Sequence, residues 1–259
     1  MAARVLTALF GAPLLLLAAW LGGFYLAAAV ALLVLLAQHE FVRLIGDLSP
    51  HRGLVFAGGL VLVTAAYLNP GRFPDAALFA LLLLYLGAFV FFFPRIAPGS
   101  LAGTLLGAVY PGLLAYLYLL RALPDGWLWL LLVLVVTWAF DMFGYFTGMV
   151  LGRIRMTPNL SPKKTVEGLA GGILAAVAAA AAGGFFIAGK LDWPFIVLGL
   201  LIGAAAQTGD LATSALKRFA GVKDAGRLLP GHGGVLDRFD SMLVSAPLGY
   251  YLIQWLILR

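Results

Sequence analysis

Long apolar runs separated by short polar stretches dominate the pattern of this chain. Each run is near the ~20 residues that an α-helix needs to cross a bilayer. The pattern therefore predicts an all-α polytopic membrane protein with about nine transmembrane helices. The nine runs lie at about 5–22, 24–44, 53–69, 75–94, 99–120, 127–150, 168–188, 194–217 and 236–257.

Composition agrees with this pattern and narrows the chemistry. Of 259 residues, 63% are hydrophobic and only 11% are charged, which is too little charge to cover a soluble domain. The first run follows Arg4 and resembles a signal peptide, but its length and the run directly after it favour a retained span. The chain has no cysteine, so disulfides and thiolate metal sites are excluded and any metal must bind oxygen or histidine.

The basic residues orient the predicted helices. With a cytoplasmic amino terminus, 13 of the 17 lysines and arginines fall on the cytoplasmic side, and only Arg72, Arg121, Lys190 and Arg259 fall outside. The positive-inside rule then predicts cytoplasmic loops at 151–167 and 218–235. The net charge of +6 thus reflects topology, and we expect no nucleic-acid partner. We expect a scaffold of about five helices over 1–125 and a catalytic region of about four helices over 126–259.

The segment 214–240 carries the densest charge of the chain. Five basic residues, three acidic residues and a histidine lie among glycines that let backbone N–H groups approach an anion. Just before and within it, Asp210, Ser214, Lys217 and Arg218 share one helical face. Cations beside carboxylates suggest a phosphate held through a metal ion. The alternative is a basic loop that only orients the protein and touches lipid head groups.

Two acids fall inside predicted spans. An ionised carboxylate at mid-bilayer costs at least ~2.5 kcal/mol, so Asp141 and Asp210 need a cation, a proton or water. We expect them to share a polar cavity on the cytoplasmic side, although Asp210 could instead pair with Lys217 or Arg218.

Glycine pairs on the same two predicted helices, Gly144 with Gly148 and Gly199 with Gly203, favour close helix packing. Tyr145 is either an interfacial aromatic or part of a pocket wall.

For three polar residues in the amino-terminal half, the sequence favours a structural or solvated role over a role in the site. His39 and Glu40 lie near the cytoplasmic end of the second run, where a snorkelling or hydrogen-bonded pair at the membrane interface is favoured over a role in the site. His51 follows Pro50 in a loop and is expected to be solvated.

The charged segment also carries a resemblance. Its Ser214, Lys217-Arg218, Lys223-Asp224, Pro230, His232-Gly233-Gly234, Asp237-Arg238 and Asp240 resemble the long signature of the phosphatidate cytidylyltransferases. The loop 159–168, read alone, fits either a phosphate cradle or a topology signal; its SPKKT followed by Glu-Gly is similar to a loop of that family. The resemblance covers roughly residues 137 to 245.

The resemblance implies that CTP and phosphatidic acid give CDP-diacylglycerol and pyrophosphate in the inner, cytoplasmic membrane. Carboxylates are hard oxygen ligands that suit Mg²⁺, which we expect as the cofactor. We also expect a homodimer in contact with membrane lipids. Asp240 either binds a second cation or, as we expect, supports Arg238 and Asp237 from outside. The metal ligands expected are Asp141, Asp210 and Asp237, and the catalytic residues add Lys217, Arg218 and Asp240. The expected substrate-binding residues are Ser161, Lys163, Lys164, Thr165, Glu167, Ser214, Lys223, Asp224, His232, Gly233, Gly234 and Arg238.

Two other functions stay open at this point. Intramembrane acids and close helix packing also occur in ion-coupled transporters, although no inverted repeat is visible here. A related enzyme would keep the CTP chemistry and activate another lipid phosphate, since apolar tails are recognised by shape that many sequences provide.

Overall fold

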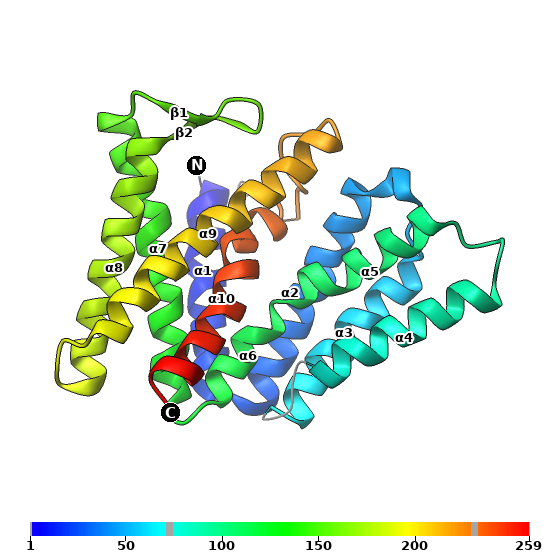
Figure 1. Cartoon of the computed structure of the whole chain (residues 1–259), viewed down its shortest axis with the longest axis horizontal. Helices are drawn as coiled ribbons and strands as arrows, with labels where there is room; N and C mark the ends of the chain where they lie inside the picture. The colour runs from blue at the N-terminus through cyan, green and yellow to red at the C-terminus, as the bar shows by residue number, and fades with distance from the viewer. Residues whose placement is uncertain (1, 71–74, 229–232, 259) are drawn as a thin grey trace. The chain divides into compact units, whose positions relative to one another are not determined.

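A computed structural model describes residues 2–70, 75–228 and 233–258, which are mostly helical (Figure 1). The prediction of an all-α protein is confirmed, with one local exception. The predicted loop 151–167 contains a two-stranded antiparallel hairpin. The described α-helices are α1 (Ala2–Leu21), α2 (Gly23–Leu44), α3 (Arg52–Leu68), α4 (Asp75–Phe91), α5 (Pro98–Gly112), α6 (Ala115–Ala122), α7 (Gly126–Leu151), α8 (Val166–Ala188), α9 (Trp193–Phe219) and α10 (Leu236–Leu256), with a 3-10 turn at Gly46–Leu48 and strands β1 (Arg155–Thr157) and β2 (Ser161–Thr165).

Helices form where the apolar runs predict them, but the fifth run is divided. Pro111 lies in the last turn of α5, where its ring removes a backbone donor and disfavours continuation of the helix. The amide of Leu113 bonds to Val109 and Tyr110, and α6 begins two residues later. The run 99–120 is therefore two helices in sequence, not one uninterrupted span.

Five described stretches are long and apolar enough to cross a bilayer: α2, residues 98–122 (α5 with α6), α7, α8 and α9. The chain is therefore a multi-pass membrane protein. Helices α3 and α4 are apolar but shorter. Among the described residues, the predicted total of nine spans is not reached by these criteria.

The chain forms two compact units, and the carboxyl-terminal charged segment is divided between them. The first unit comprises Met1–Ala122 and Phe219–Arg238, and the second comprises Leu123–Arg218 and Phe239–Arg259. The first boundary is close to the predicted one at 125. The segment 219–238, however, groups with the amino-terminal helices instead of with the rest of the predicted catalytic region.

In the first unit, α2 packs against α3 and α5 around the buried side chain of Gln38. Its Nε2 donates to the carbonyl of Val55 at 2.8 Å and to that of Gly107 at 3.3 Å, so one amide links three helices. A side chain at Gly59 would collide with Gln38, so this glycine permits the close approach of α3. The unit thus has a polar centre inside an apolar scaffold.

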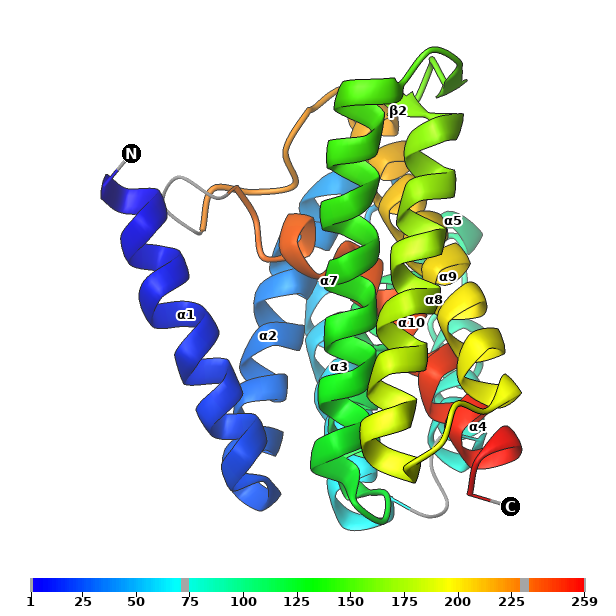
Figure 2. The same ribbon diagram turned by 90° about the vertical axis from the view of Figure 1, so that its left-hand side faces the viewer.

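In the second unit, α7 and α8 run side by side, with the hairpin at one shared end (Figure 2). Hypothetical Cβ atoms show how closely these two helices approach. One at Gly168 would lie 2.8 Å from the Gly144 carbonyl oxygen and 3.2 Å from the Gly148 Cα, and one at Gly148 would lie 3.1 Å from the Thr165 hydroxyl oxygen. The predicted role of Gly144 and Gly148 in helix packing is confirmed.

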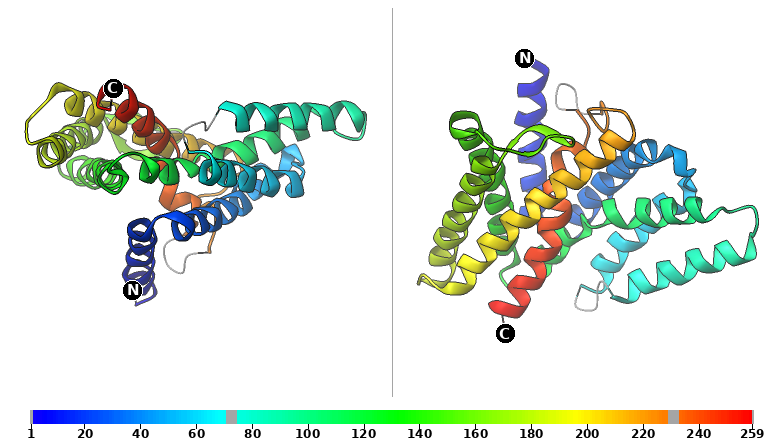
Figure 3. Two further views of the ribbon diagram at one scale, coloured as in Figure 1. Left: turned by 90° about the horizontal axis from the view of Figure 1, so that it is seen from below. Right: turned by 45° about the horizontal axis from the view of Figure 1, so that its top comes forward.

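Helix α9 completes the second unit by packing closely on both α8 and α10 (Figure 3). A Cβ at Gly199 would lie 2.7 Å from the Ala176 carbonyl oxygen on α8, which confirms the packing role predicted for that glycine. A Cβ at Gly209 would collide with the Asp240 carbonyl on α10. Gly209 thus brings the neighbouring Asp210 toward Asp240.

Candidate active site

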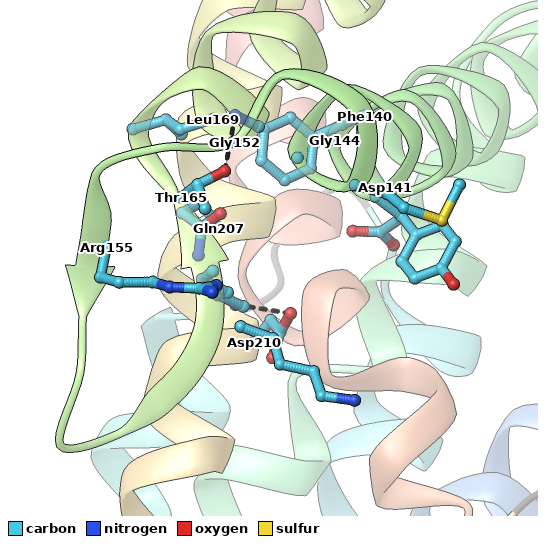
Figure 4. A pocket seen from close by; sticks show the side chains of 15 residues that line it. Phe140, Asp141, Gly144, Gly152, Arg155, Thr165, Leu169, Gln207 and Asp210 are labelled. Carbon is cyan, nitrogen blue, oxygen red and sulfur yellow. Dashed lines mark hydrogen bonds and ion pairs between the residues drawn. The ribbon is translucent and has the colours of Figure 1, made fainter.

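A cavity of about 570 Å³ lies in the second unit (Figure 4). It is enclosed by α7, the hairpin, the start of α8 and the middle of α9. Its walls combine three cations and two carboxylates with glycines and a few apolar side chains. The lining residues are Phe140, Asp141, Gly144, Tyr145, Gly148, Met149, Gly152, Arg155, Lys163, Lys164, Thr165, Gly168, Leu169, Gln207 and Asp210.

An ion pair links two elements that line this cavity. Lys164 on β2 places its Nζ 2.6 Å from Oδ2 of Asp210 on α9, and both side chains are mostly buried. The hydroxyl of Ser214, one turn further along α9, donates to Oδ1 of Asp210 at 3.3 Å. The sequence analysis named Lys217 and Arg218 as alternative partners of Asp210; the hairpin lysine Lys164 is a partner that it did not name.

Asp141, Asp210 and Asp240 form one electrostatic group. Oδ1 of Asp141 accepts a hydrogen bond from the Ser241 hydroxyl at 3.1 Å, which links α7 to α10. The charges of Asp210, Lys217 and Asp141 all act on the Asp240 carboxylate. Three carboxylates from three helices therefore lie within each other's electrostatic range, with lysines as their counter-charges.

The hairpin is fixed at both of its ends. Glu167, at the start of α8, accepts hydrogen bonds from the amides of Arg153 and Ile154, and Thr165 caps α8 by accepting from the Gly168 amide at 3.1 Å. At the turn, Nε of Arg218 donates to the Leu160 carbonyl at 3.1 Å. These bonds position the hairpin that carries Lys163 and Lys164, which both line the cavity.

The segment 219–238 of the first unit is held by a separate set of carboxylates. Oδ2 of Asp237 accepts from the amides of Ala225 at 2.8 Å and Gly234 at 3.0 Å. Gly233 adopts φ +84°, a left-handed conformation that favours glycine. Lys223 and Asp224 are exposed. Pro230 and His232, both part of the predicted signature, lie outside the described residues.

A model of the cytidylyltransferase family matches residues 2–256. The chain belongs to the cytidylyltransferase family. The match spans both units, so the amino-terminal helices are part of the family architecture and not an appended anchor.

Three similar proteins share the name phosphatidate cytidylyltransferase. The one from Synechocystis sp. is 33% identical over 290 residues, which cover 98% of this chain and 97% of the relative. The one from Brucella abortus is 34% identical over 249 residues, covering 95% and 91%. The one from Bacillus subtilis is 42% identical over 153 residues, covering 57% and 56%.

The structure brings some of the predicted site residues to the cavity and gives others supporting contacts. Asp141, Lys163, Lys164, Thr165 and Asp210 line the cavity. Ser214 donates a hydrogen bond to Asp210, and Arg218 donates one to the hairpin turn at Leu160. Glu167 accepts one from the amide of Arg153, just before the hairpin. Lys217 acts on Asp240 through its charge, and Ser161 begins strand β2. Lys223, Asp224, Gly233, Gly234, Asp237 and Arg238 belong to the first unit.

Two cavity residues were missed by the sequence analysis. Arg155 on β1 adds a third cation to those of Lys163 and Lys164. Gln207 presents a buried Nε2 that has no hydrogen-bond partner among the described residues. Its position one helical turn before Asp210 is the sequence signal that could have identified it.

Glu40 was also misjudged. It is fully buried, so the snorkelling alternative is wrong, and its carboxylate accepts hydrogen bonds from the amides of Val235 and Leu236. Hydrogen bonding was the other predicted alternative, but its partners are main-chain amides almost two hundred residues away. His51 is exposed, as expected, and also caps α3 through the Leu54 amide.

Proposed function

We propose that this protein transfers the cytidylyl group of CTP to phosphatidic acid, giving CDP-diacylglycerol and pyrophosphate. The observation that carries the proposal is the similarity over nearly the whole chain to proteins named phosphatidate cytidylyltransferase. The cavity supports it, because lysines and an arginine beside carboxylates are suited to a polyphosphate substrate.

The chemistry needs no protein nucleophile. An oxygen of the phosphatidic acid phosphate attacks the α-phosphorus of CTP, and the bond from that phosphorus to the oxygen bridging to the β-phosphate breaks. Pyrophosphate leaves with the electron pair of the broken bond. Because the attacking phosphate is already an anion, the protein's task is to align the groups and neutralise developing charge.

The cations of the hairpin are proposed to hold the triphosphate. Lys163, Lys164 and Arg155 line the cavity, and Thr165 lies beside them. Lys217 and Arg218 at the end of α9 are proposed to assist. Lys223 and Arg238 are proposed to do the same; both belong to the segment 219–238, which we call the signature segment. Gln207 offers an amide donor to an acceptor oxygen or nitrogen of the nucleotide.

The donor chemistry of the carboxylates fits a hard divalent cation such as Mg²⁺. Among the described residues, no three His, Asp or Glu side chains are grouped closely enough to chelate one ion. We therefore propose that at most two of the carboxylates Asp141, Asp210 and Asp240, which act on one another electrostatically, would bind the ion directly. A cation there would supply positive charge to the phosphates, as metal ions do in phosphoryl transfer.

This assignment exchanges two predicted roles. The sequence analysis made Asp237 a ligand and Asp240 its support, whereas one oxygen of Asp237 is engaged by two backbone amides of its own segment. We therefore propose that Asp237 shapes the segment and Asp240 belongs to the carboxylate group.

The remaining predictions on topology and assembly are retained as proposals. They are nine spans, a cytoplasmic amino terminus, a site open to the cytoplasmic side where CTP is available, the inner membrane as location, and a homodimer. The transporter alternative is not retained, since the family match assigns a transferase chemistry over residues 2–256.

The direct test is a reconstitution. Purified protein in liposomes that contain phosphatidic acid is given CTP labelled in the α-phosphate, with Mg²⁺. The label should pass to the lipid, and unlabelled pyrophosphate should be released in an amount equal to that of the labelled lipid formed. A panel of other lipid phosphates in the same assay would show whether a different lipid is preferred, and intact folded protein that releases no pyrophosphate would contradict the proposal.

A further inference from the structure

The least expected ionisable group in the first unit is Glu40, near the end of α2. Its side chain is fully buried, and the proposed chemistry does not use it. Burial of a carboxylate is costly unless hydrogen bonds or opposite charges compensate it. The contacts of Glu40 therefore indicate what it is for.

Both oxygens of Glu40 bind the signature segment of the same unit. Oε1 accepts from the Val235 amide at 3.1 Å, and Oε2 accepts from the Leu236 amide at 2.8 Å. Leu236 is the first residue of α10, and amides at a helix start are open to an anionic acceptor. The negative charge of Asp237 opposes that of Glu40, and the charge of Arg43, further along α2, acts favourably on it.

Two glycines of the segment are shaped around this carboxylate. A Cβ at Gly226 or at Gly234 would collide with carboxylate atoms of Glu40. The segment therefore lies close against the Glu40 carboxylate at two points, and the absence of side chains at these two positions permits that approach.

Asp237 supplies the second tie of the same segment. Its Oδ2 binds the amides of Ala225 and Gly234, so residues 225 and 234–236 are all held by carboxylates. Asp237 belongs to the segment itself, whereas Glu40 belongs to α2. Glu40 is thus the group that fastens the segment to the helical scaffold of its unit.

We infer that Glu40 is a positioning residue for cytidylyl transfer: its bidentate grip on the Val235 and Leu236 amides holds the signature segment in the conformation that binds CTP. The inference rests on the proposed function, because the segment carries Lys223, proposed to contact the triphosphate. Glu40 itself touches no reacting atom and acts through the backbone that it holds.

Two substitutions separate this role from simple packing. Glu40→Gln keeps the size of the side chain but loses the charge and one of the two acceptors. Glu40→Asp keeps the charge and both acceptors but is shorter by one methylene. If the carboxylate positions the segment, Asp should preserve CTP use better than Gln; if only volume matters, Gln should be the better substitute.

The expected result for Glu40→Gln is a rise in KM for CTP of roughly tenfold to a hundredfold, as expected for the loss of one buried charged hydrogen bond. The variant should remain folded in detergent, and kcat should change less than KM. Glu40→Asp should raise KM less. Gln38→Leu is the matched control, because Gln38 is equally buried on α2 but bonds to carbonyls of α3 and α5; it should lower stability without changing KM for CTP.

Hydrogen–deuterium exchange provides a readout that does not depend on turnover. Peptides covering 233–240 should exchange faster in Glu40→Gln than in the wild type, and peptides from α7 and α8 should not. If the wild type does not use CTP but Glu40→Gln still exchanges faster over 233–240, the proposed function is contradicted. The attachment of the segment by Glu40 is then still supported. Unchanged exchange, or faster exchange with unchanged KM and kcat, would overturn the inference. Should Glu40→Gln not fold, a wild-type KM in Glu40→Asp with faster exchange would overturn it as well.

Discussion

Single residues of the cavity offer a direct test of charge, and Lys164 is the most informative. Lys164→Ala leaves the Asp210 carboxylate without its ion-pair partner and removes a cation from the proposed triphosphate site. We expect kcat/KM for CTP to fall by roughly tenfold to a hundredfold, equivalent to one charged hydrogen bond.

Lys190 provides the control for this experiment. It forms an ion pair of similar length with Asp192, at 3.0 Å, but it is exposed and lies in a loop remote in sequence from the hairpin. Lys190→Ala should leave CTP kinetics unchanged, since exposed ion pairs contribute little. Equal effects of the two substitutions would contradict a specific role for Lys164.

Gln207 tests whether an unpartnered donor in the cavity is reserved for substrate. Gln207→Leu removes a buried amide nitrogen, Nε2, that has no hydrogen-bond partner among the described residues, so thermal stability in detergent should be unchanged or higher. Steady-state assays should nevertheless show kcat/KM for CTP reduced by roughly tenfold, the value of one hydrogen bond. Thr208→Ala is the control, because its exposed hydroxyl bonds within α9 to Ala204; loss of activity there but not at Gln207 would rule out the assignment.

At the scale of elements, glycine contacts decide how closely α7 and α8 approach. A Cβ at Gly168 would lie 2.8 Å from the Gly144 carbonyl oxygen and 3.2 Å from the Gly148 Cα, both main-chain atoms that cannot rotate away. Gly168→Ala should therefore destabilise the protein by about 1–3 kcal/mol, the usual cost of overpacking. The change is measured as a lower Tm in detergent.

Gly87→Ala is the opposite control. Gly87 lies on α4, and no atom lies within 4 Å of its hypothetical Cβ. The same substitution should there be neutral or stabilising by about 0.5–1 kcal/mol, because alanine is the better helix former. A Tm that falls equally in both variants would show that close packing is not the cause.

At the scale of the whole molecule, the proposed topology can be tested because the chain has no native cysteine. Asn159→Cys lies in the exposed turn of the hairpin, and Leu191→Cys lies in the exposed loop after α8. With a cytoplasmic hairpin, an impermeant maleimide should label Leu191→Cys in spheroplasts and Asn159→Cys only in inside-out vesicles. The reverse pattern would invert the topology, and labelling of both from one side would remove α8 as a span.

The sequence by itself determined the class of the protein and most of its helices. Apolar runs predict helices well because the cost of leaving backbone groups unpaired in a bilayer is local and leaves few alternatives. Charged groups within and beside such runs are equally conspicuous, so Asp141, Asp210 and the hairpin lysines could be identified as candidate site residues without a structure. The signature segment likewise predicted the family that the whole-chain match then showed.

Only the tertiary structure decided which of these groups meet. The pairing of Lys164 with Asp210, the grouping of Asp240 with Asp141 and Asp210, and the grip of Glu40 on Val235 and Leu236 each join parts of the chain that are distant in sequence. Apolar patterning cannot distinguish partners on different helices, because it reports only which face of a helix is buried. Close packing at glycines such as Gly209 and Gly234 sets the distances between these paired groups. Such packing depends on the shapes of both segments in contact, which the pattern of one segment does not contain.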